Sequence, residues 1–395
     1  MGKPVYITAS AHTQFAIQAE QSVYSLMAAA INQLIDEAAV DASFIGAVFV
    51  ANYSGGSFNN QEHLAPYAVS VNSELRYKPM YRAEGACASG SSAIHLAQMA
   101  IQSGQIDSAL VVGVEKMSNL ATPEVTKALA KASYYPLEGA QGYTFPGLFA
   151  EFAKGWLQHY KQDPQKLRQW LAEISSKAYA LGELNPMAQL RKARSAESIL
   201  SLTADKNPLI AGPLRLHDCS PISDGAAAIL LSKHKPLEQA VELCAMSTCC
   251  DYLNIVDSPK SNYFLEGASR AVREVLQRGN LTLQDIQFAE VHDCFTIAEF
   301  LMYSALGLTE PGREFEALQS GDVLAGGPCV INPSGGLKSK GHPVGATGVS
   351  MHALAYRQLC QQASGFQVDN AANALIVNLG GSAATNVASL LKRHH

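Results

Sequence analysis

Apolar residues fall into short continuous runs along the chain, separated by longer segments with helical spacing. The runs predict strands at residues 46–50, 109–113, 226–231, 286–291, 374–378 and 384–391. Apolar runs of this length, without polar alternation, are typical of strands that are covered on both faces. Helices between such strands indicate an α/β fold with a layered architecture.

A weak internal repeat indicates that the fold is built from two related halves. Turns of small residues near positions 225 and 381 each lead into a predicted strand. Each half also has a small-residue loop that opens a long apolar helix. We therefore predict two domains, residues 1–240 and 241–395.

Residues 116–215 differ in character from the rest of the chain. They combine Tyr-, Pro- and Gly-rich loops with helical stretches rich in Lys, Gln and Arg. We expect an insertion of helices and loops that lies over the first half. Such an insertion can shape a substrate entrance, or it can be a stabilising excursion without ligand contact.

The composition is that of a large globular enzyme, because 48% of the 395 residues are hydrophobic and only 16% are charged. The net charge of 29 − 34 = −5 comes without a basic block, so nucleic acid is not expected as a partner. No apolar run reaches the roughly 18 residues that a membrane span needs. The first residues also lack the apolar region of a signal peptide.

The eight cysteines form no Cys-x-x-Cys pair and show no zinc-ligand spacing with histidine, so no metal site is predicted. We expect a cytoplasmic location, where a reducing environment keeps these thiols free.

Cys87 is the first candidate for chemistry. It lies among small residues, directly before a predicted apolar helix at 93–101. The free N–H groups and the positive dipole end of a helix favour a thiolate, and small neighbours leave room for an acyl group. A lone cysteine is more commonly a buried, inert residue.

Two downstream segments place further candidates at junctions between elements. His292 and Cys294 follow the predicted strand 286–291 and precede a predicted helix, where α/β active sites are assembled. His342 lies between glycine and proline, on a loop that opens another helix. Each histidine alone is more often structural. Their shared position with Cys87 at such junctions indicates a common site.

Four segments in fixed order along the chain resemble the thiolase superfamily: residues 85–90, 218–227, 292–295 and 341–348. The segment His292-Asp293-Cys294-Phe295 resembles the sterol-carrier-protein type of thiolase, since most other thiolases have Asn-Glu-Ala-Phe there. Those thiolases also carry a late cysteine in a Cys-x-Gly motif, where this chain has Asn378-Leu379-Gly380.

The resemblance implies a thiolase fold: two duplicated βαβαβαββ halves in a five-layer α-β-α-β-α arrangement, with a loop-domain insertion in the first half. It also implies a role for each site residue. Cys87 attacks an acyl thioester, His342 takes the thiol proton, and Cys294 is the general acid/base. His292 and His342 donate hydrogen bonds to the enolate oxygen, and the backbone N–H groups of Cys87 and Gly380 form a second oxyanion hole.

The implied activity is that of an acyl-CoA C-acyltransferase, with coenzyme A thioesters as substrates and no permanently bound cofactor. A ketoacyl-synthase-like condensing enzyme also uses one cysteine and two histidines, but it lacks the second cysteine. Two further alternatives are an acyltransferase with a non-CoA acceptor, working in a multi-subunit complex, and a non-catalytic lipid-binding protein. The resemblance implies a homodimer or homotetramer, and it admits a small partner subunit with an oligonucleotide-binding fold.

Overall fold

Ten strands form one mixed sheet in the computed structural model, which describes residues 3–236 and 240–394. The N-terminal half supplies β1 (Tyr6–His12), β2 (Ala47–Ala51), β3 (Met80–Ala83), β4 (Ser108–Lys116) and β7 (Asp224–Ser232). The C-terminal half supplies β8 (Ala240–Cys250), β9 (Phe288–Val291), β10 (Val330–Ile331), β11 (Asn373–Gly380) and β12 (Thr385–His394). Their order across the sheet is β10-β9-β11-β12-β8-β1-β7-β4-β2-β3.

The strand order repeats between the halves. Outward from the centre, the first half runs β1-β7-β4-β2-β3 and the second runs β8-β12-β11-β9-β10. The halves meet where β1 and β8 pair antiparallel, with Tyr6 opposite Glu242 and Ile7 opposite Val241. Each strand of one half therefore has a counterpart at the same place in the other half.

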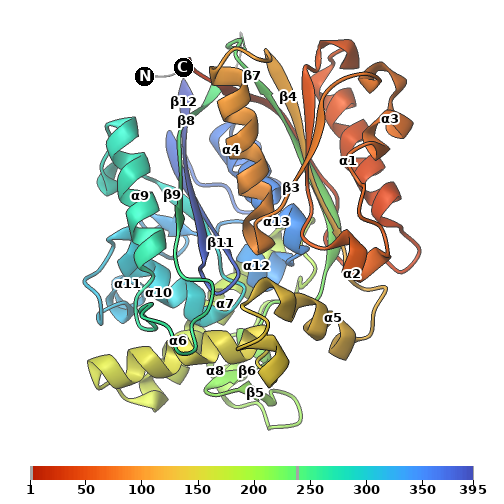
Figure 1. The fold of residues 1–395 in the computed structure, drawn as a ribbon. Coiled ribbons are helices and arrows are strands. Elements are labelled where there is room, and N and C mark those ends of the chain that lie inside the picture. Colours follow the sequence, from red (N-terminus) through yellow and green to blue (C-terminus); the bar gives the residue numbers. More distant parts are fainter. Residues whose placement is uncertain (1–2, 237–239, 395) are drawn as a thin grey trace.

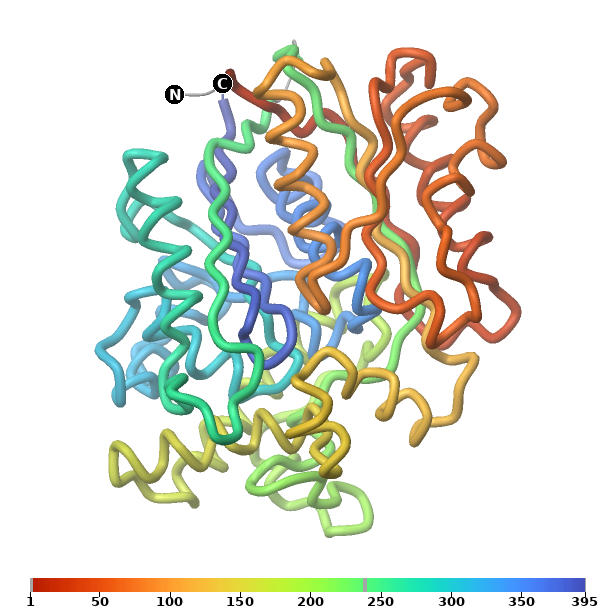
Figure 2. The backbone as a smooth tube through the Cα atoms, in the orientation of Figure 1, coloured from red at the N-terminus to blue at the C-terminus, as the bar shows by residue number. Residues whose placement is uncertain are grey.

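Helices complete five layers, α-β-α-β-α (Figure 1). Between the two halves of the sheet lie α4 (Ser89–Gln102) and α13 (Thr347–Leu359), which contact strands of both halves. On the outer faces lie α1 (Val23–Ala38) in the first half and α9 (Glu266–Gly279) in the second, with α10 (Thr296–Leu306) beside α9. Shorter helices are α2 (Gly55–Asn59), α3 (Tyr67–Val71), α11 (Phe315–Gln319) and α12 (Gly336–Lys340). Figure 2 shows the start of β1 beside the end of β12.

The apolar strands are covered on both faces, as their sequence predicts. In β2, Val48 and Val50 belong to the cluster under α1, whereas Ala47 and Phe49 belong to the larger core on the opposite face. All six predicted strands are present, and the predicted helices coincide with α4, α10 and α13. The other four strands of the sheet, β1, β3, β8 and β10, are not among these six.

The insertion, residues 116–215, contacts both halves of the chain and not only the first. It contains α5 (Thr122–Leu129), α6 (Phe145–Tyr160), α7 (Pro164–Leu184), α8 (Ala196–Leu200) and the hairpin β5 (Leu209–Ala211) to β6 (Leu214–Arg215). The expectation that it lies over the first half is wrong in part, because α6 and α7 contact α10 of the second half. The reason is apolar packing: the rings of Trp156 and Trp170 lie against Phe300 of α10.

The N-terminal ends of α4 and α13 touch at two glycines. A Cβ added to Gly90 would lie 2.5 Å from the backbone nitrogen of Val349, and one added to Gly348 would lie 2.3 Å from that of Ser91. Backbone atoms cannot be displaced as easily as the end of a flexible side chain. The two helices therefore approach this closely only without side chains at these positions.

We predict that Gly90→Ala lowers the free energy of unfolding by about 1–3 kcal/mol through overpacking, although alanine is the better helix former. Urea denaturation midpoints measure the effect. The matched control is Gly147→Ala in α6, where the added Cβ would meet nothing closer than 3.5 Å. Equal midpoints for the two variants would contradict the proposed close contact.

Candidate active site

Cys87 lies on the sharp turn that connects β3 to α4. The preceding Ala86 has φ of +53°, a left-handed conformation that is uncommon for a residue other than glycine. The turn (Ala86–Ala88) ends where α4 begins, and Cys87 is only 7% exposed. The predicted placement of a thiol at the N-terminal end of a helix is therefore confirmed.

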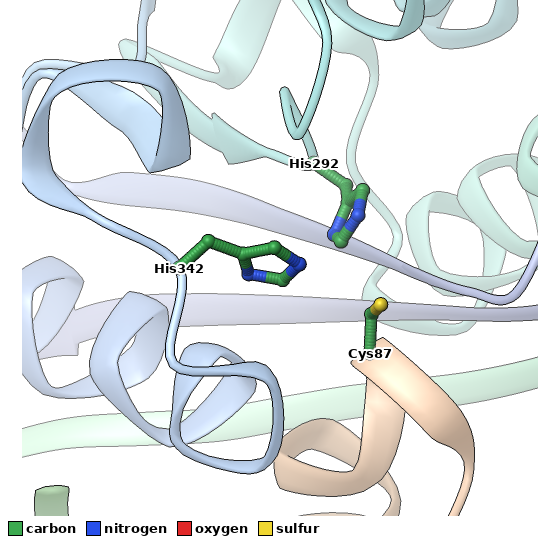
Figure 3. A group of neighbouring side chains, drawn as sticks. All are labelled: Cys87, His292 and His342. Atoms are coloured by element: carbon green, nitrogen blue, oxygen red, sulfur yellow. The ribbon is translucent and has the colours of Figure 1, made fainter. Parts of the chain in front are cut away.

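His292 and His342 converge on Cys87 from the other half of the chain (Figure 3). The sulfur of Cys87 and one ring nitrogen of each histidine all lie within 4.8 Å of one another. The two rings have centroids 5.2 Å apart at an interplanar angle of 83°. His292 follows the end of β9, and His342 lies on the loop between α12 and α13. Three of the predicted residues thus share one buried location.

Cys294 reaches the same place from the β9–α10 loop. It lines a cavity of about 400 Å³ together with Cys87 and His342. Burial raises the pKa of the Cys294 thiol well above its usual range, and the neighbouring Cys87 raises it further. Cys294 is therefore a neutral thiol that faces the cavity next to Cys87.

Gly381 is the glycine of the Gly380-Gly381 pair that lies beside the sulfur. Its backbone N–H acts on the thiol of Cys87 and lowers the pKa, and Gly381 lines the cavity. A Cβ added to Gly380 would be 2.2 Å from the carbonyl oxygen of Gly85. The oxyanion-hole role of the Gly380 N–H, which would act on a substrate oxygen, stays a prediction.

The hydrogen bonds of His342 determine its tautomer. Its Nδ1 lies 2.7 Å from the hydroxyl of Thr347, and that hydroxyl donates to the carbonyl of Pro343 at 3.0 Å. Because the hydroxyl hydrogen is committed to Pro343, the Nδ1 of His342 must be the donor. The neutral ring then has its lone pair on Nε2, the atom that a general base needs.

His292 has the opposite tautomer, determined by Asn378 of β11. The Asn378 amide nitrogen donates to the carbonyl oxygen of Cys87 at 3.1 Å and lies 3.0 Å from the Nδ1 of His292. A carbonyl oxygen can only accept, which identifies the amide atom as nitrogen. Nδ1 of His292 is therefore an acceptor, and Nε2 carries the proton. This buried Nε2 has no hydrogen-bond partner.

The same assignment bears on metal binding. Cys87, His292 and His342 are residue types that bind zinc. A metal needs a lone pair from each ligand, yet His292 presents an N–H from Nε2 while its Nδ1 accepts from Asn378. The cluster is thus arranged to donate a hydrogen bond to an oxygen atom, and it does not fit a metal ion.

Burial dominates the electrostatics of the nucleophile. It raises the pKa of Cys87 to about 12, with Glu115 acting in the same direction and the N–H of Gly381 opposing it. The expectation of a thiolate stabilised by the helix is therefore wrong for the free protein. Burial and the nearby Lys340 lower the pKa of His342 to about 3. The resting pair is a neutral thiol beside a neutral imidazole.

Comparison with known proteins agrees with this geometry. Residues 5–158 match the family model described as "Thiolase, N-terminal domain", and residues 249–393 match "Thiolase C-terminal domain-like". An acetyl-CoA acetyltransferase of Methanothermobacter thermautotrophicus is 34% identical over 91% of both chains.

The chain belongs to the thiolase family.

Two further known proteins are similar to this thiolase. Sterol carrier protein 2 of Gallus gallus is 29% identical over 96% of this chain and 70% of its own length. The structure named Ltp2-ChsH2(DUF35) aldolase superposes with a TM-score of 0.82 at 16% identity, covering 99% of this chain and 98% of the other. At that identity the superposition shows the shared fold. The family matches favour a thiolase over the ketoacyl-synthase-like alternative.

Sequence reasoning missed the residues that hold this thiolase's site together. Asp293 accepts the backbone N–H of Leu337 at 2.6 Å, which fastens the β9–α10 loop to α12. Glu115 accepts the backbone N–H of Gly345 at 2.9 Å, which fastens the His342 loop to β4 of the first half. Asn378 could have been identified from the sequence, because by the motif resemblance it stands where other thiolases have their late cysteine.

We predict that iodoacetamide alkylates Cys87 of the free enzyme faster as pH rises from 7 to 10, without a plateau, since a pKa of about 12 leaves only a small thiolate fraction that grows with pH. Peptide mass mapping separates Cys87 from the exposed Cys250. A plateau reached by pH 7 would indicate a preformed thiolate and contradict the assigned protonation state.

We predict that Asn378→Asp slows turnover about 10²–10³-fold at neutral pH, because a carboxylate accepts from Nδ1 of His292 and removes the proton from Nε2. Asn373→Asp, at the other end of β11, is the matched control, since its amide contacts only the carbonyl of Asp285. Steady-state rates and circular dichroism on both variants separate a catalytic effect from unfolding. Unchanged turnover in Asn378→Asp would rule out the tautomer argument.

Proposed function

We propose that this thiolase makes or breaks a carbon–carbon bond between acyl groups carried as coenzyme A thioesters. The observation that carries the proposal is the cluster of the Cys87 thiol with two imidazoles of opposite tautomer, beside a cavity that Cys87, His342 and a second thiol, Cys294, line together. Each of these groups is in the protonation state that one step of a Claisen reaction requires.

Acylation begins with the proton of Cys87. Nε2 of His342 accepts it as the sulfur attacks the thioester carbonyl, so the thiolate forms only as it reacts. The backbone N–H of Cys87, with Gly380 or the better-placed Gly381, stabilises the tetrahedral oxyanion. Coenzyme A leaves with the proton of Cys294. The products are an acyl-enzyme, a Cys294 thiolate and a protonated His342.

Condensation uses the charges that acylation leaves. The Cys294 thiolate removes a proton from the carbon next to the second thioester carbonyl. The enolate oxygen accepts hydrogen bonds from Nε2–H of His292 and from Nε2–H of the protonated His342. The enolate then attacks the acyl-enzyme, and the departing sulfur of Cys87 recovers its proton from His342. Thiolysis runs the same steps in reverse.

We also propose the finer features that accompany this activity. The division into domains 1–240 and 241–395 would fall at the start of β8. None of the eight cysteines is joined in a disulfide, which supports a cytoplasmic location. Among the described residues, no helix has both the length and the apolar character to cross a bilayer. A dimer is proposed from the family resemblance, and a small partner subunit from the DUF35 named with the aldolase neighbour.

The assignment of Cys294 gives the sharpest test of the mechanism. We predict that Cys294→Ala still gains one acetyl group at Cys87 from acetyl-CoA, because a coenzyme A thiolate can leave without a proton donor. The variant should lose condensation and the exchange of the acetyl-CoA methyl protons with D2O. Intact-protein mass and NMR measure the two steps separately.

The control is Cys329→Ala, a buried cysteine that does not line the cavity. It should retain both steps. Equal loss of acylation and exchange in Cys294→Ala would remove the role assigned to Cys294. Failure of the unaltered enzyme to form any adduct at Cys87 would overturn the proposed function.

A further inference from the structure

The cavity beside Cys87 has a long apolar wall that an acetyl group would not fill. Helix α5 contributes Thr122, Val125, Thr126 and Leu129 to the lining, a spacing that places all four on one face. Val125 and Cys87 belong to the same buried apolar cluster, with Leu129 packed against it. The wall is therefore continuous with the nucleophile.

A second part of the lining is apolar as well. Phe145, Leu216, Ile222 and Phe295 form it and are called here the Phe145–Phe295 wall, and the rings of Phe149 and Phe295 lie 4.9 Å apart. An acyl chain attached to the sulfur of Cys87 would lie against these side chains and α5. Each methylene group beyond the acetyl carbons would then leave water for an apolar surface.

No formally charged side chain is among the described residues that line this cavity. Its polar groups are hydroxyls, one amide, thiols and the imidazole of His342. That imidazole is neutral, since its pKa is lowered to about 3. Glu115 and Glu84 act on the pKa of Cys87 and Lys340 acts on that of His342, but none of these three side chains lines the cavity. A substrate carboxylate in the cavity would thus meet no cation on its lining.

We propose that the acyl group transferred through Cys87 is a neutral aliphatic chain longer than acetyl, held between α5 and the Phe145–Phe295 wall, and that acyl groups with a terminal carboxylate are excluded. The inference rests on the proposed function, which it deepens by naming the substrate class. Three thioesters distinguish the cases: acetyl-CoA, pentanoyl-CoA, and succinyl-CoA as the charged counterpart of similar size.

Acylation of Cys87 by each thioester is followed by quenched-flow mass measurement. We expect kcat/KM for pentanoyl-CoA to exceed that for acetyl-CoA about tenfold or more, as for added methylenes in an apolar pocket, and that for succinyl-CoA to be about a hundredfold lower than for pentanoyl-CoA. A rate for acetyl-CoA equal to or above that for pentanoyl-CoA, or comparable rates for succinyl-CoA and pentanoyl-CoA, would overturn the inference and leave the proposed function standing. Absence of acylation by all three would overturn both.

Two pairs of variants test the wall itself. Leu129→Trp should fill the space along α5 and lower the pentanoyl-CoA rate about tenfold with little change for acetyl-CoA. Lys127→Trp adds the same ring to the exposed face of α5, outside the lining, and should leave both rates unchanged.

Thr126→Lys should admit succinyl-CoA by supplying the missing cation, whereas Thr126→Met, of similar length but neutral, should not. Loss of acetyl-CoA and pentanoyl-CoA acylation in equal measure in Leu129→Trp, or no gain for succinyl-CoA in a folded Thr126→Lys, would count against the proposed site.

Discussion

The close contact between the N-terminal ends of α4 and α13 is the constraint on which the site depends. Cys87 precedes α4 and His342 precedes α13, so the distance between the two helix ends decides the distance between sulfur and imidazole. Gly90 and Gly348 let the backbones meet, and the duplicated strand order brings the two helices into the same central layer. Chemistry between halves of the chain follows from this packing.

Burial keeps Cys87 and His342 uncharged in the free protein, because it disfavours both the thiolate and the imidazolium. The thiol and the imidazole are both neutral at rest because the cavity is poor in polar groups. Charge appears only when a substrate carbonyl is present to receive it. The two histidines have opposite tautomers because Thr347 accepts a hydrogen bond from His342 and Asn378 donates one to His292.

The amino-acid sequence predicted much of the sheet but not all of it. Long apolar runs identified the strands that are buried on both faces. The central strand β8 escaped notice because Glu242, Ser247 and Thr248 interrupt its apolar pattern, with the last two facing a neighbouring helix. The short strands β3 and β10 have too few residues to show any period.

The site was predictable in its residue types but less so in its electrostatics. Motifs identified Cys87, His292, Cys294 and His342. The structure places Cys87, Cys294 and His342 on one cavity and the buried ring of His292 beside Cys87 and His342. The pKa of the Cys87 thiol is raised, whereas the position before a helix predicts a lowered one. Burial by the whole surrounding core raises it, and this burial cannot be read from the adjacent helix alone.

Asn378 carries an evolutionary consequence. By the motif resemblance it stands at the place of the late cysteine of other thiolases, while His292 and Cys294 stand where those enzymes have asparagine and alanine. The amide at 378 donates to Nδ1 of the imidazole at 292 and so directs its proton to Nε2. The identities of residues 292 and 378 are therefore coupled, and an exchange at one of them changes what the other has to supply.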